Sequence, residues 1–359
     1  MTILMFLAGL IALTAGAELL VRGASKMALS FGISPLVVGL TIVAFGTSTP
    51  EMAVSVGAVL DGQTDIAVGN VVGSNIFNVL FILGVSALIT PLVVNIQLIR
   101  QEVPILLGAS LLLLLFALDG RVGVVEGATL FSLLLAYTVF LVVQSRRETQ
   151  SAKNEYAAEF QRSSKEGWDG RLPVQIALIV VGLTLLVAGS DWLVSSAVVF
   201  AKALGVSDAI IGLTIVAAGT SMPEVATSVM AAIKGERDIA VGNVVGSCTF
   251  NLLGCVGLAG LAAGEAGLLI PPSLLSFDIW VMVAAALICV PAFMTGREIA
   301  RWEGGMFLGL YTAYLTYLAL TAQLSPALPD FNAAMTGILL PLAVIALVIS
   351  MVRGTGHTG

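Results

Sequence analysis

The sequence predicts an all-α polytopic membrane protein, made of two inverted five-helix repeats and one further C-terminal span. Three observations predict this fold class: an apolar composition, a series of eleven apolar stretches and a gap-free internal repeat. Of the 359 residues, 58% are hydrophobic and 11% are charged, and the mean hydropathy is +1.04. Soluble domains carry about 25% charged residues, so the composition alone places the chain in a lipid bilayer.

Eleven stretches approach the roughly 20 apolar residues that a helical span requires. They cover residues 2–21, 35–60, 66–92, 103–118, 123–143, 173–195, 208–233, 239–264, 274–295, 304–322 and 332–352. The first stretch contains Ala15-Gly16-Ala17, which is similar to a signal-peptide cleavage site, but no basic segment precedes it. Because this stretch also takes part in the internal repeat, we predict a retained span.

The basic residues are distributed unequally across the predicted spans. If successive loops alternate sides, fourteen of the 16 Lys and Arg residues fall on one side, and only Arg121 and Lys202 fall on the other. The side that is rich in Lys and Arg is normally cytoplasmic. The sequence therefore predicts a multi-pass protein of the cell inner (plasma) membrane, with its N-terminus outside and its C-terminus in the cytoplasm.

The internal repeat explains most of this pattern. Residues 32–84 align without a gap with residues 205–257, and 32 of the 53 positions are identical. The offset of 173 residues contains five spans, and because five is odd the second copy enters the membrane from the opposite face. Inverted repeats are typical of secondary transporters, whose substrate site lies between the repeats near the midplane. The predicted division is a first repeat (1–143), a cytoplasmic linker loop (144–172), an inverted second repeat (173–322) and an extra C-terminal span with a cytoplasmic tail (323–359).

Two helix-breaking motifs lie at equivalent positions of the second and seventh spans. The segment GTSTPE, which ends at Glu51, matches GTSMPE, which ends at Glu224. Glycine and proline interrupt a helix and free backbone carbonyls, which membrane proteins tolerate where the backbone lines a cavity or binds an ion. A charged side chain at this depth costs at least about 2.5–3.5 kcal/mol, so the sequence predicts a functional rather than a structural role for both glutamates.

Further polar residues recur in the third and eighth spans, where GNVVGS is followed by an asparagine. Ser74 and Asn78 are four residues apart and share one helical face, and Ser247 and Asn251 repeat this spacing. With the glutamates and the freed carbonyls, they form an all-oxygen ligand set. Calcium and sodium prefer such oxygens, whereas zinc favours nitrogen or sulfur and magnesium gives up its water reluctantly.

GTSTPE and GTSMPE, each followed by GNVVGS-x-x-FN, resemble the two alpha-repeats of the calcium/cation antiporter superfamily, most closely its bacterial sodium/calcium exchanger branch. The resemblance covers the first ten spans and implies a secondary active antiporter that exchanges Ca²⁺ for Na⁺ by alternating access. It implies calcium held by Glu51 and Glu224 with the backbone carbonyls of Thr47 and Thr220. It also implies sodium sites that are formed by Ser48, Ser74, Ser221, Ser247 and the backbone of Ala44 and Ala217. Asn78 and Asn251 would line the middle of the site.

The sequence departs from this family in two places. Some of these exchangers carry an aspartate where Asn251 stands, which gives them a third carboxylate. This sequence has only two, so it does not define how many sodium ions are exchanged per calcium or whether potassium has a role. The eleventh span has no counterpart in the ten-helix core, and we interpret it as an appended helix for packing or dimer contact.

The remaining polar and sulfur-containing residues are interpreted as structural. Glu18 and Arg22 are expected to pair with each other at the membrane interface, and Asp191 and Asp278 to have structural roles. The cysteines are predicted to be small apolar fillers within spans, and His357 lies in a tail without functional weight.

Other functional classes fit less well. Proton-coupled or potassium-dependent calcium transport stays a direct alternative, because glutamates also carry protons. An intramembrane hydrolase using Ser48 or Ser221 lacks a base at suitable depth, and a scaffold or receptor leaves the paired glutamates unexplained. A channel is less favoured than alternating access because the broken helices lie in inverted halves. We expect no enzyme activity, no cofactor, no nucleic acid and no obligate protein partner; the expected partners are Ca²⁺, Na⁺ and the bilayer.

Overall fold

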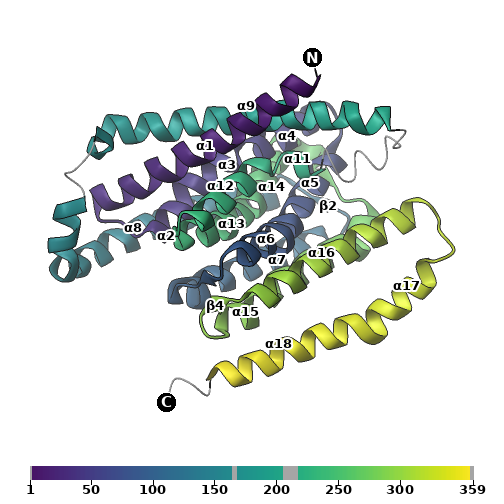
Figure 1. Cartoon of the computed structure of the whole chain (residues 1–359). Helices are drawn as coiled ribbons and strands as arrows, with labels where there is room; N and C mark the ends of the chain where they lie inside the picture. Colours follow the sequence, from purple (N-terminus) through teal and green to yellow (C-terminus); the bar gives the residue numbers. More distant parts are fainter. Residues whose placement is uncertain (1, 164–167, 205–216, 356–359) are drawn as a thin grey trace.

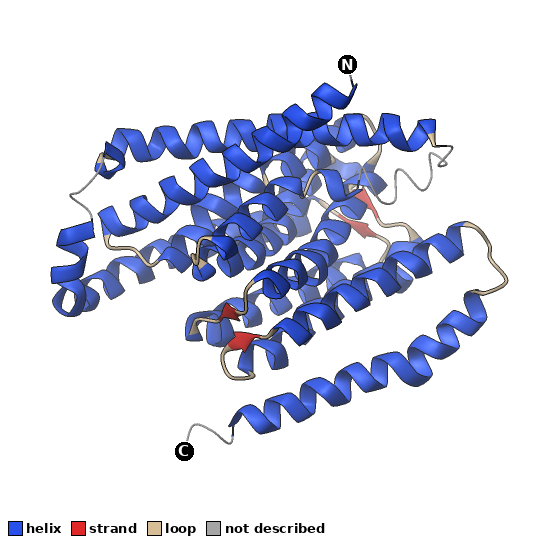
Figure 2. Cartoon of the chain, in the orientation of Figure 1, coloured by secondary structure: helices blue, strands red, loops and turns tan. Residues whose placement is uncertain are grey.

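Helices make up almost all of the structure, a computed structural model that describes residues 2–163, 168–204 and 217–355 (Figure 2). Among these residues, nine helices are long and apolar enough to cross a membrane, and a tenth span is a bent pair, Pro35–Thr47 with Thr49–Leu60. The start of the predicted seventh span, 208–216, lies outside the described residues, as does His357. The protein is thus an all-α, polytopic membrane protein.

The first repeat contains eight α-helical segments and three π-helical turns. The helices are α1 (Thr2–Phe31), α2 (Pro35–Val38), α3 (Ala44–Thr47), α4 (Thr49–Leu60), α5 (Thr64–Ile76), α6 (Leu83–Ile89), α7 (Val103–Ala117) and α8 (Val124–Ser163). The turns are η1 (Gly39–Val43), η2 (Phe77–Ile82) and η3 (Leu98–Glu102). Helix α8 continues to Ser163, so the segment that the sequence predicts as a linker loop is largely helical.

The second repeat follows the same order. Its helices are α9 (Leu172–Ala203), α11 (Ala217–Gly219), α12 (Met222–Ile233), α13 (Arg237–Phe250), α14 (Val256–Ala262), α15 (Ile279–Met294) and α16 (Arg301–Ala322). Its π-helical turns are η6 (Asn251–Cys255) and η8 (Leu274–Asp278), and the 3₁₀ turns are η4 (Trp168–Gly170) and η7 (Gly264–Ala266). The C-terminal span is formed by α17 (Leu328–Ala334), η9 (Met335–Leu339) and α18 (Leu340–Thr355).

Four two-residue strands show that the repeats are inverted. β1 (Leu92–Val93) pairs antiparallel with β4 (Glu298–Ile299), and β2 (Arg121–Val122) pairs antiparallel with β3 (Leu268–Leu269). β1 and β3 both follow the third span of their repeat, whereas β2 and β4 both follow the fourth. Each pair therefore joins non-equivalent loops of the two repeats, which happens when one copy is turned over relative to the other.

A carboxylate at the start of the fourth span of each repeat provides a second sign of this symmetry. Glu102 ends η3, is fully buried and accepts a hydrogen bond of 2.7 Å from the Tyr137 hydroxyl. Asp278 ends η8 and accepts one of 2.8 Å from the Tyr314 hydroxyl. In both repeats the tyrosine lies on the following span, so the acid and tyrosine tie the fourth and fifth spans together.

Helices α1 and α9 cross at one side of the bundle, in extended contact (Figure 1). Glycines allow their backbones to approach closely, because a Cβ atom added at Gly16 would lie 2.7 Å from the Gly182 carbonyl oxygen. At Gly189 an added Cβ would lie 2.9 Å from the Gly9 carbonyl oxygen. Small residues at such contacts are the usual means of packing helices in a membrane, where no hydrophobic effect drives them together.

Ion pairs join α1 to neighbouring segments at its predicted cytoplasmic half, and they correct the expected Glu18–Arg22 pair. Lys234 lies 2.8 Å from Glu18, and Arg22 lies 2.8 Å from Asp169. The hydrogen bond from Arg22 lowers the pKa of Asp169 below its usual value. Glu18 and Arg22 therefore pair with residues that are distant in the chain. Their helical spacing indicates only which residues of the same helix are neighbours.

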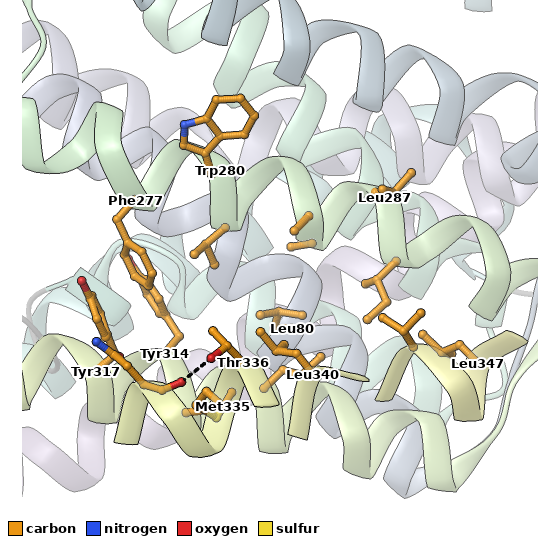
Figure 3. A pocket seen from close by; sticks show the side chains of 18 of the residues that line it. Leu80, Phe277, Trp280, Leu287, Tyr314, Tyr317, Met335, Thr336, Leu340 and Leu347 are labelled. Atoms are coloured by element: carbon orange, nitrogen blue, oxygen red, sulfur yellow. Dashed lines mark hydrogen bonds between the residues drawn. The ribbon is translucent and has the colours of Figure 1, made fainter. Parts of the chain in front are cut away.

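The C-terminal span lies on the side of the molecule opposite α1 and α9 (Figure 1). A cavity of about 620 Å³ separates α17 and α18 from α15 and α16, and its lining is almost entirely apolar (Figure 3). Trp280 and Leu287 line it from the core side and Leu340 and Leu347 from the C-terminal span. The Thr336 hydroxyl at this cavity donates a 2.8 Å hydrogen bond to the backbone carbonyl of Asn332.

Candidate ion-binding site

The two helix breaks fall where the sequence predicts them. Ser48 separates α3 from α4, which are bent by 41° relative to each other, and Pro50 lies in the first turn of α4. Thr220 and Ser221 separate α11 from α12 in the second repeat, with Pro223 in the place equivalent to Pro50. Proline lacks a backbone N–H, so it begins a helix readily but cannot continue the hydrogen bonding of the preceding one.

The breaks bring the two glutamates to one centre through crossed hydrogen bonds. The Ser48 hydroxyl donates to Glu224 Oε1 over 3.3 Å, and the Ser221 hydroxyl donates to Glu51 Oε1 over 3.0 Å. Each serine thus bonds the carboxylate of the other repeat. All four side chains are fully buried. The glutamates of the two repeats therefore face a single buried polar centre between α4 and α12.

The threonines before these serines also bond across the repeats. Thr47 Oγ1 lies 3.1 Å from Asn243 Oδ1 and 3.3 Å from Ser247 Oγ. Thr220 Oγ1 lies 3.3 Å from Asn70 Oδ1. The contacts Thr47–Asn243 and Thr220–Asn70 are equivalent under the repeat, so the pseudo-twofold relation extends to side-chain hydrogen bonds.

Several buried polar atoms of the glutamates and of the elements packed against α4 and α12 have no hydrogen-bond partner among the residues that the structure describes. They are Glu51 Oε2, Glu224 Oε2, Ser74 Oγ, both side-chain polar atoms of Asn78, and Asn251 Nδ2. Within the same residues, neither glutamate has an ion pair with Lys, Arg or His. Unpartnered buried polar groups are costly, so the free oxygens of the two facing glutamates, Glu51 Oε2 and Glu224 Oε2, indicate a ligand-binding centre. Oxygen atoms of this kind suit a hard cation.

The remaining predicted residues occupy the surrounding helices. The Ala44 carbonyl accepts the backbone N–H of Ser48 over 3.0 Å and the Thr47 hydroxyl over 3.4 Å. Asn251 Oδ1 accepts a 3.4 Å contact from the Cys255 thiol. Ser74, Asn78 and Asn251 are buried but make no hydrogen bond to Glu51 or Glu224. Ala217 begins α11.

Four residues of this network were not among the predicted site residues. Asn70 and Ser55 bond each other over 3.1 Å, and Asn243 and Ser228 bond over 2.9 Å. All four are identical between the repeats, and this identity was the available signal. Ser55 and Ser228 each follow the glutamate of their repeat by four residues, which places them on the same helical face.

No solvent reaches the carboxylates, since Glu51 and Glu224 are both fully buried. A cavity of about 1110 Å³ lies beside the centre and is lined by Met52 and Phe250, the neighbours of Glu51 and Asn251. Most of its other lining is apolar, including Phe31 and Leu135. The described centre is therefore closed, and this cavity does not offer a hydrated cation a polar path to it.

A family model described as sodium/calcium exchanger protein matches residues 1–143 and 174–320. The chain belongs to the sodium/calcium exchanger family. Among its relatives, inner membrane protein YrbG of Escherichia coli is 36% identical over 331 residues, covering 91% of this chain and 98% of the relative. Sodium/calcium exchanger MaX1 of Methanosarcina acetivorans is 33% identical over 344 residues, covering 88% and 97%.

The solved structures agree with this assignment. The sodium-calcium exchanger NCX_Mj, soaked with zero Na⁺ and Ca²⁺, matches with a TM-score of 0.74 and 29% identity, covering 88% of this chain and 98% of that one. The predicted membership in the calcium/cation antiporter superfamily and the inverted-repeat fold are confirmed. This member of the exchanger family is a multi-pass cation antiporter rather than an enzyme.

Proposed function

We propose that this exchanger moves Ca²⁺ in one direction against Na⁺ in the other, binding both at the centre between α4 and α12. One observation carries the proposal: the crossed contacts Ser48–Glu224 and Ser221–Glu51 place two carboxylates at one buried, oxygen-rich centre. The names of the related exchangers support the same pair of ions. Glu51 and Glu224 with the carbonyls of Thr47 and Thr220 would hold calcium.

The charges at this centre favour a divalent cation or its equivalent. Two carboxylates without a basic partner balance the two positive charges of Ca²⁺, and calcium accepts irregular sets of six to eight oxygens. Ser48, Ser74, Ser221 and Ser247 supply neutral oxygens that sodium ions can use when calcium leaves. Asn78 and Asn251 line the middle, and the backbone of Ala44 and Ala217 completes the proposed sodium ligands.

The same charges explain why transport would be an exchange and not a leak. If the ions left and the site closed empty, two desolvated carboxylates would face each other without compensation, at a cost of several kcal/mol. A closed site is therefore favourable only when calcium or enough monovalent cations neutralise it. The protein would then change between its outward-open and inward-open states only when calcium or sodium ions occupy the site.

Sodium is preferred over protons as the coupling ion because of the ligand set. A proton needs only a carboxylate oxygen. Buried hydroxyl and amide oxygens without partners, Ser74 Oγ and Asn78 Oδ1, lie on α5 and η2, which pack against α4 and α12. Such neutral oxygens suit a cation that requires several ligands at once. No cofactor and no obligate protein partner are part of this mechanism.

Purified protein in liposomes tests this function. Calcium-45 uptake is measured after imposing a sodium, proton or potassium gradient, one at a time, with the membrane potential clamped. We expect an outward sodium gradient to drive uptake, and a protonophore to leave it unchanged. Uptake driven by a pH gradient alone and abolished by the protonophore would show proton coupling. Absence of uptake under every gradient would contradict calcium antiport itself.

The proposed location is the cell inner membrane, with the N-terminus outside and residues 144–172 in the cytoplasm. Exposed Gln63 precedes α5 on the predicted outer side, and exposed Arg171 precedes α9 on the predicted inner side. We expect a membrane-impermeant maleimide added to intact cells to label Gln63→Cys but not Arg171→Cys. The three native cysteines are free and buried, so their background should be low. The reverse labelling pattern would show the opposite orientation.

A further inference from the structure

The side-chain amides of Asn70 and Asn243 form two equivalent bridges beside the glutamates. Asn70 lies on α5 and is half-buried, and Asn243 lies on α13 and is fully buried. We propose that both asparagines are positioning residues that set the separation of the two halves of the ion site, and thereby its preference among divalent cations by size. This inference rests on the calcium antiport proposed above.

Each amide group holds the glutamate-bearing helix of its own repeat. Asn70 Nδ2 donates to the Glu51 backbone carbonyl over 3.3 Å and to Ser55 Oγ over 3.1 Å. Asn243 Nδ2 donates to the Glu224 carbonyl over 3.5 Å and to Ser228 Oγ over 2.9 Å. The two hydrogens of each amide nitrogen are therefore used within one repeat, one at the glutamate's own carbonyl and one at the serine a turn after it.

Each amide oxygen holds the other repeat. Asn70 Oδ1 accepts from the Thr220 hydroxyl, and Asn243 Oδ1 accepts from the Thr47 hydroxyl, over 3.3 Å and 3.1 Å. The Thr47 hydroxyl has one hydrogen, and its contact with Asn243 Oδ1 at 3.1 Å is shorter than that with the Ala44 carbonyl at 3.4 Å. When Thr47 donates to Asn243, the contact with Ser247 requires Ser247 to donate to Thr47. One short side chain thus connects the backbone at a glutamate with the threonine at the opposite helix break.

The orientation of the amide is determined by its neighbours. The Ser55 hydroxyl donates to the Ala67 carbonyl over 3.4 Å, so Ser55 Oγ offers its lone pair to Asn70. Asn70 must then present its nitrogen to Ser55 and its oxygen to Thr220. Aspartate cannot donate these hydrogen bonds, and leucine of similar size can neither donate nor accept.

The bridge reaches the ion through the residues next to the threonines. Thr47 and Thr220 immediately precede Ser48 and Ser221, whose hydroxyls bond the glutamates of the opposite repeat. Holding each threonine therefore holds the serine–glutamate contact beside it, as well as the threonine carbonyl proposed to bind calcium. A centre held from both sides adapts less to a larger ion, so loosening the bridges should reduce discrimination between Ca²⁺ and Sr²⁺.

Equilibrium calcium-45 binding to purified protein tests this role independently of the coupling ion, with Sr²⁺ as competitor. We expect Asn243→Leu and Asn70→Leu each to weaken calcium binding on the order of tenfold, as loss of a buried hydrogen-bonding group does. The ratio of Sr²⁺ to Ca²⁺ affinity should shift toward strontium by at least about threefold. Thr47→Val, which removes only the hydroxyl, should shift the ratio in the same direction, and its effect should not add to that of Asn243→Leu.

Asn75→Cys is the matched control. Asn75 is a buried asparagine of the same helix α5 that contacts Met282, and the equivalent position of the second repeat is Cys248. This variant should keep wild-type affinity and selectivity. If the Asn70, Asn243 and Thr47 variants fold and keep their calcium affinity and selectivity, the positioning role is overturned and the proposed calcium antiport is not affected. If the leucine variants do not fold, unchanged selectivity in both Thr47→Val and Thr220→Val would overturn it. A wild-type protein that binds no calcium would overturn both this inference and the proposed function.

Discussion

Replacing either Glu51 or Glu224 by glutamine is expected to abolish calcium exchange while the protein still folds and inserts. Both carboxylates are fully buried at one centre, and each is bonded by the serine of the other repeat. Removing one leaves a divalent cation opposite a single negative charge, in surroundings where electrostatic interactions are stronger than in water. Glutamine preserves the size and one oxygen, so packing should survive.

The repeat symmetry makes this prediction sharper. Because each repeat contributes one carboxylate to a shared centre, both single variants should fail and neither should retain half of the activity. Insertion should not suffer, since a neutral amide costs less than a carboxylate in hydrocarbon. Calcium-45 flux in liposomes, on protein that elutes as a single species, measures the outcome.

Glu102→Gln is the matched control for these variants. Glu102 is also a fully buried glutamate of a membrane span, but it is held by Tyr137, Gln97 and Gln101, away from the helix breaks. Calcium exchange should persist in this variant. Near wild-type exchange by Glu51→Gln or Glu224→Gln would contradict the two-glutamate site, and equal loss in Glu102→Gln would mean that a buried charge matters only for folding.

The residues of the candidate site could be found from the sequence because they lie within an unusually similar repeat. Polar and helix-breaking residues such as Pro50 and Glu51 stand out in apolar spans, and their second copies remove most of the ambiguity. An odd number of spans per repeat then predicts inversion. The two antiparallel strand pairs and the crossed serine–glutamate contacts agree with that prediction.

The contacts between repeats could not be found in the same way. Helical spacing relates residues of one helix, so it suggested pairing Glu18 with Arg22, whereas the structure pairs them with Lys234 and Asp169. For the same reason the sequence did not single out Asn70 as a bridge to Thr220, which lies 150 residues away. Glu102 lies one residue before the predicted fourth span (103–118), so the sequence did not indicate that this glutamate is buried.

Substitution of Gly182 is expected to produce a large loss of stability outside the ion site. A Cβ atom at Gly182 would lie 2.7 Å from the backbone nitrogen of Leu20 and 2.8 Å from the Gly16 carbonyl oxygen. Both are backbone atoms of a long helix and cannot move without separating α1 from α9. Overpacking of this kind costs about 1–3 kcal/mol for a small group, so Gly182→Ala should lower the unfolding temperature clearly and Gly182→Leu should prevent stable folding.

Gly108→Ala separates this clash from the general effect of adding a methyl group. Gly108 lies within α7, and a Cβ there meets no atom within 4 Å. Alanine favours a helix over glycine by roughly 0.5–1 kcal/mol, so Gly108→Ala should be neutral or slightly stabilising. To compare the variants, the detergent-purified proteins are heated and the fraction that stays monodisperse is measured at each temperature.

The opposed position of Gly16 adds a test of the mechanism. An added Cβ at Gly16 would meet the Gly182 carbonyl, and one at Gly182 would meet the Gly16 carbonyl, so both substitutions strain the same helix crossing. Once one alanine has moved α1 away from α9, the second should cost less than it does alone, and the double variant should be less destabilised than the sum. Additive losses, or Gly182→Ala as stable as Gly108→Ala, would show that α1 and α9 do not pack closely through these glycines.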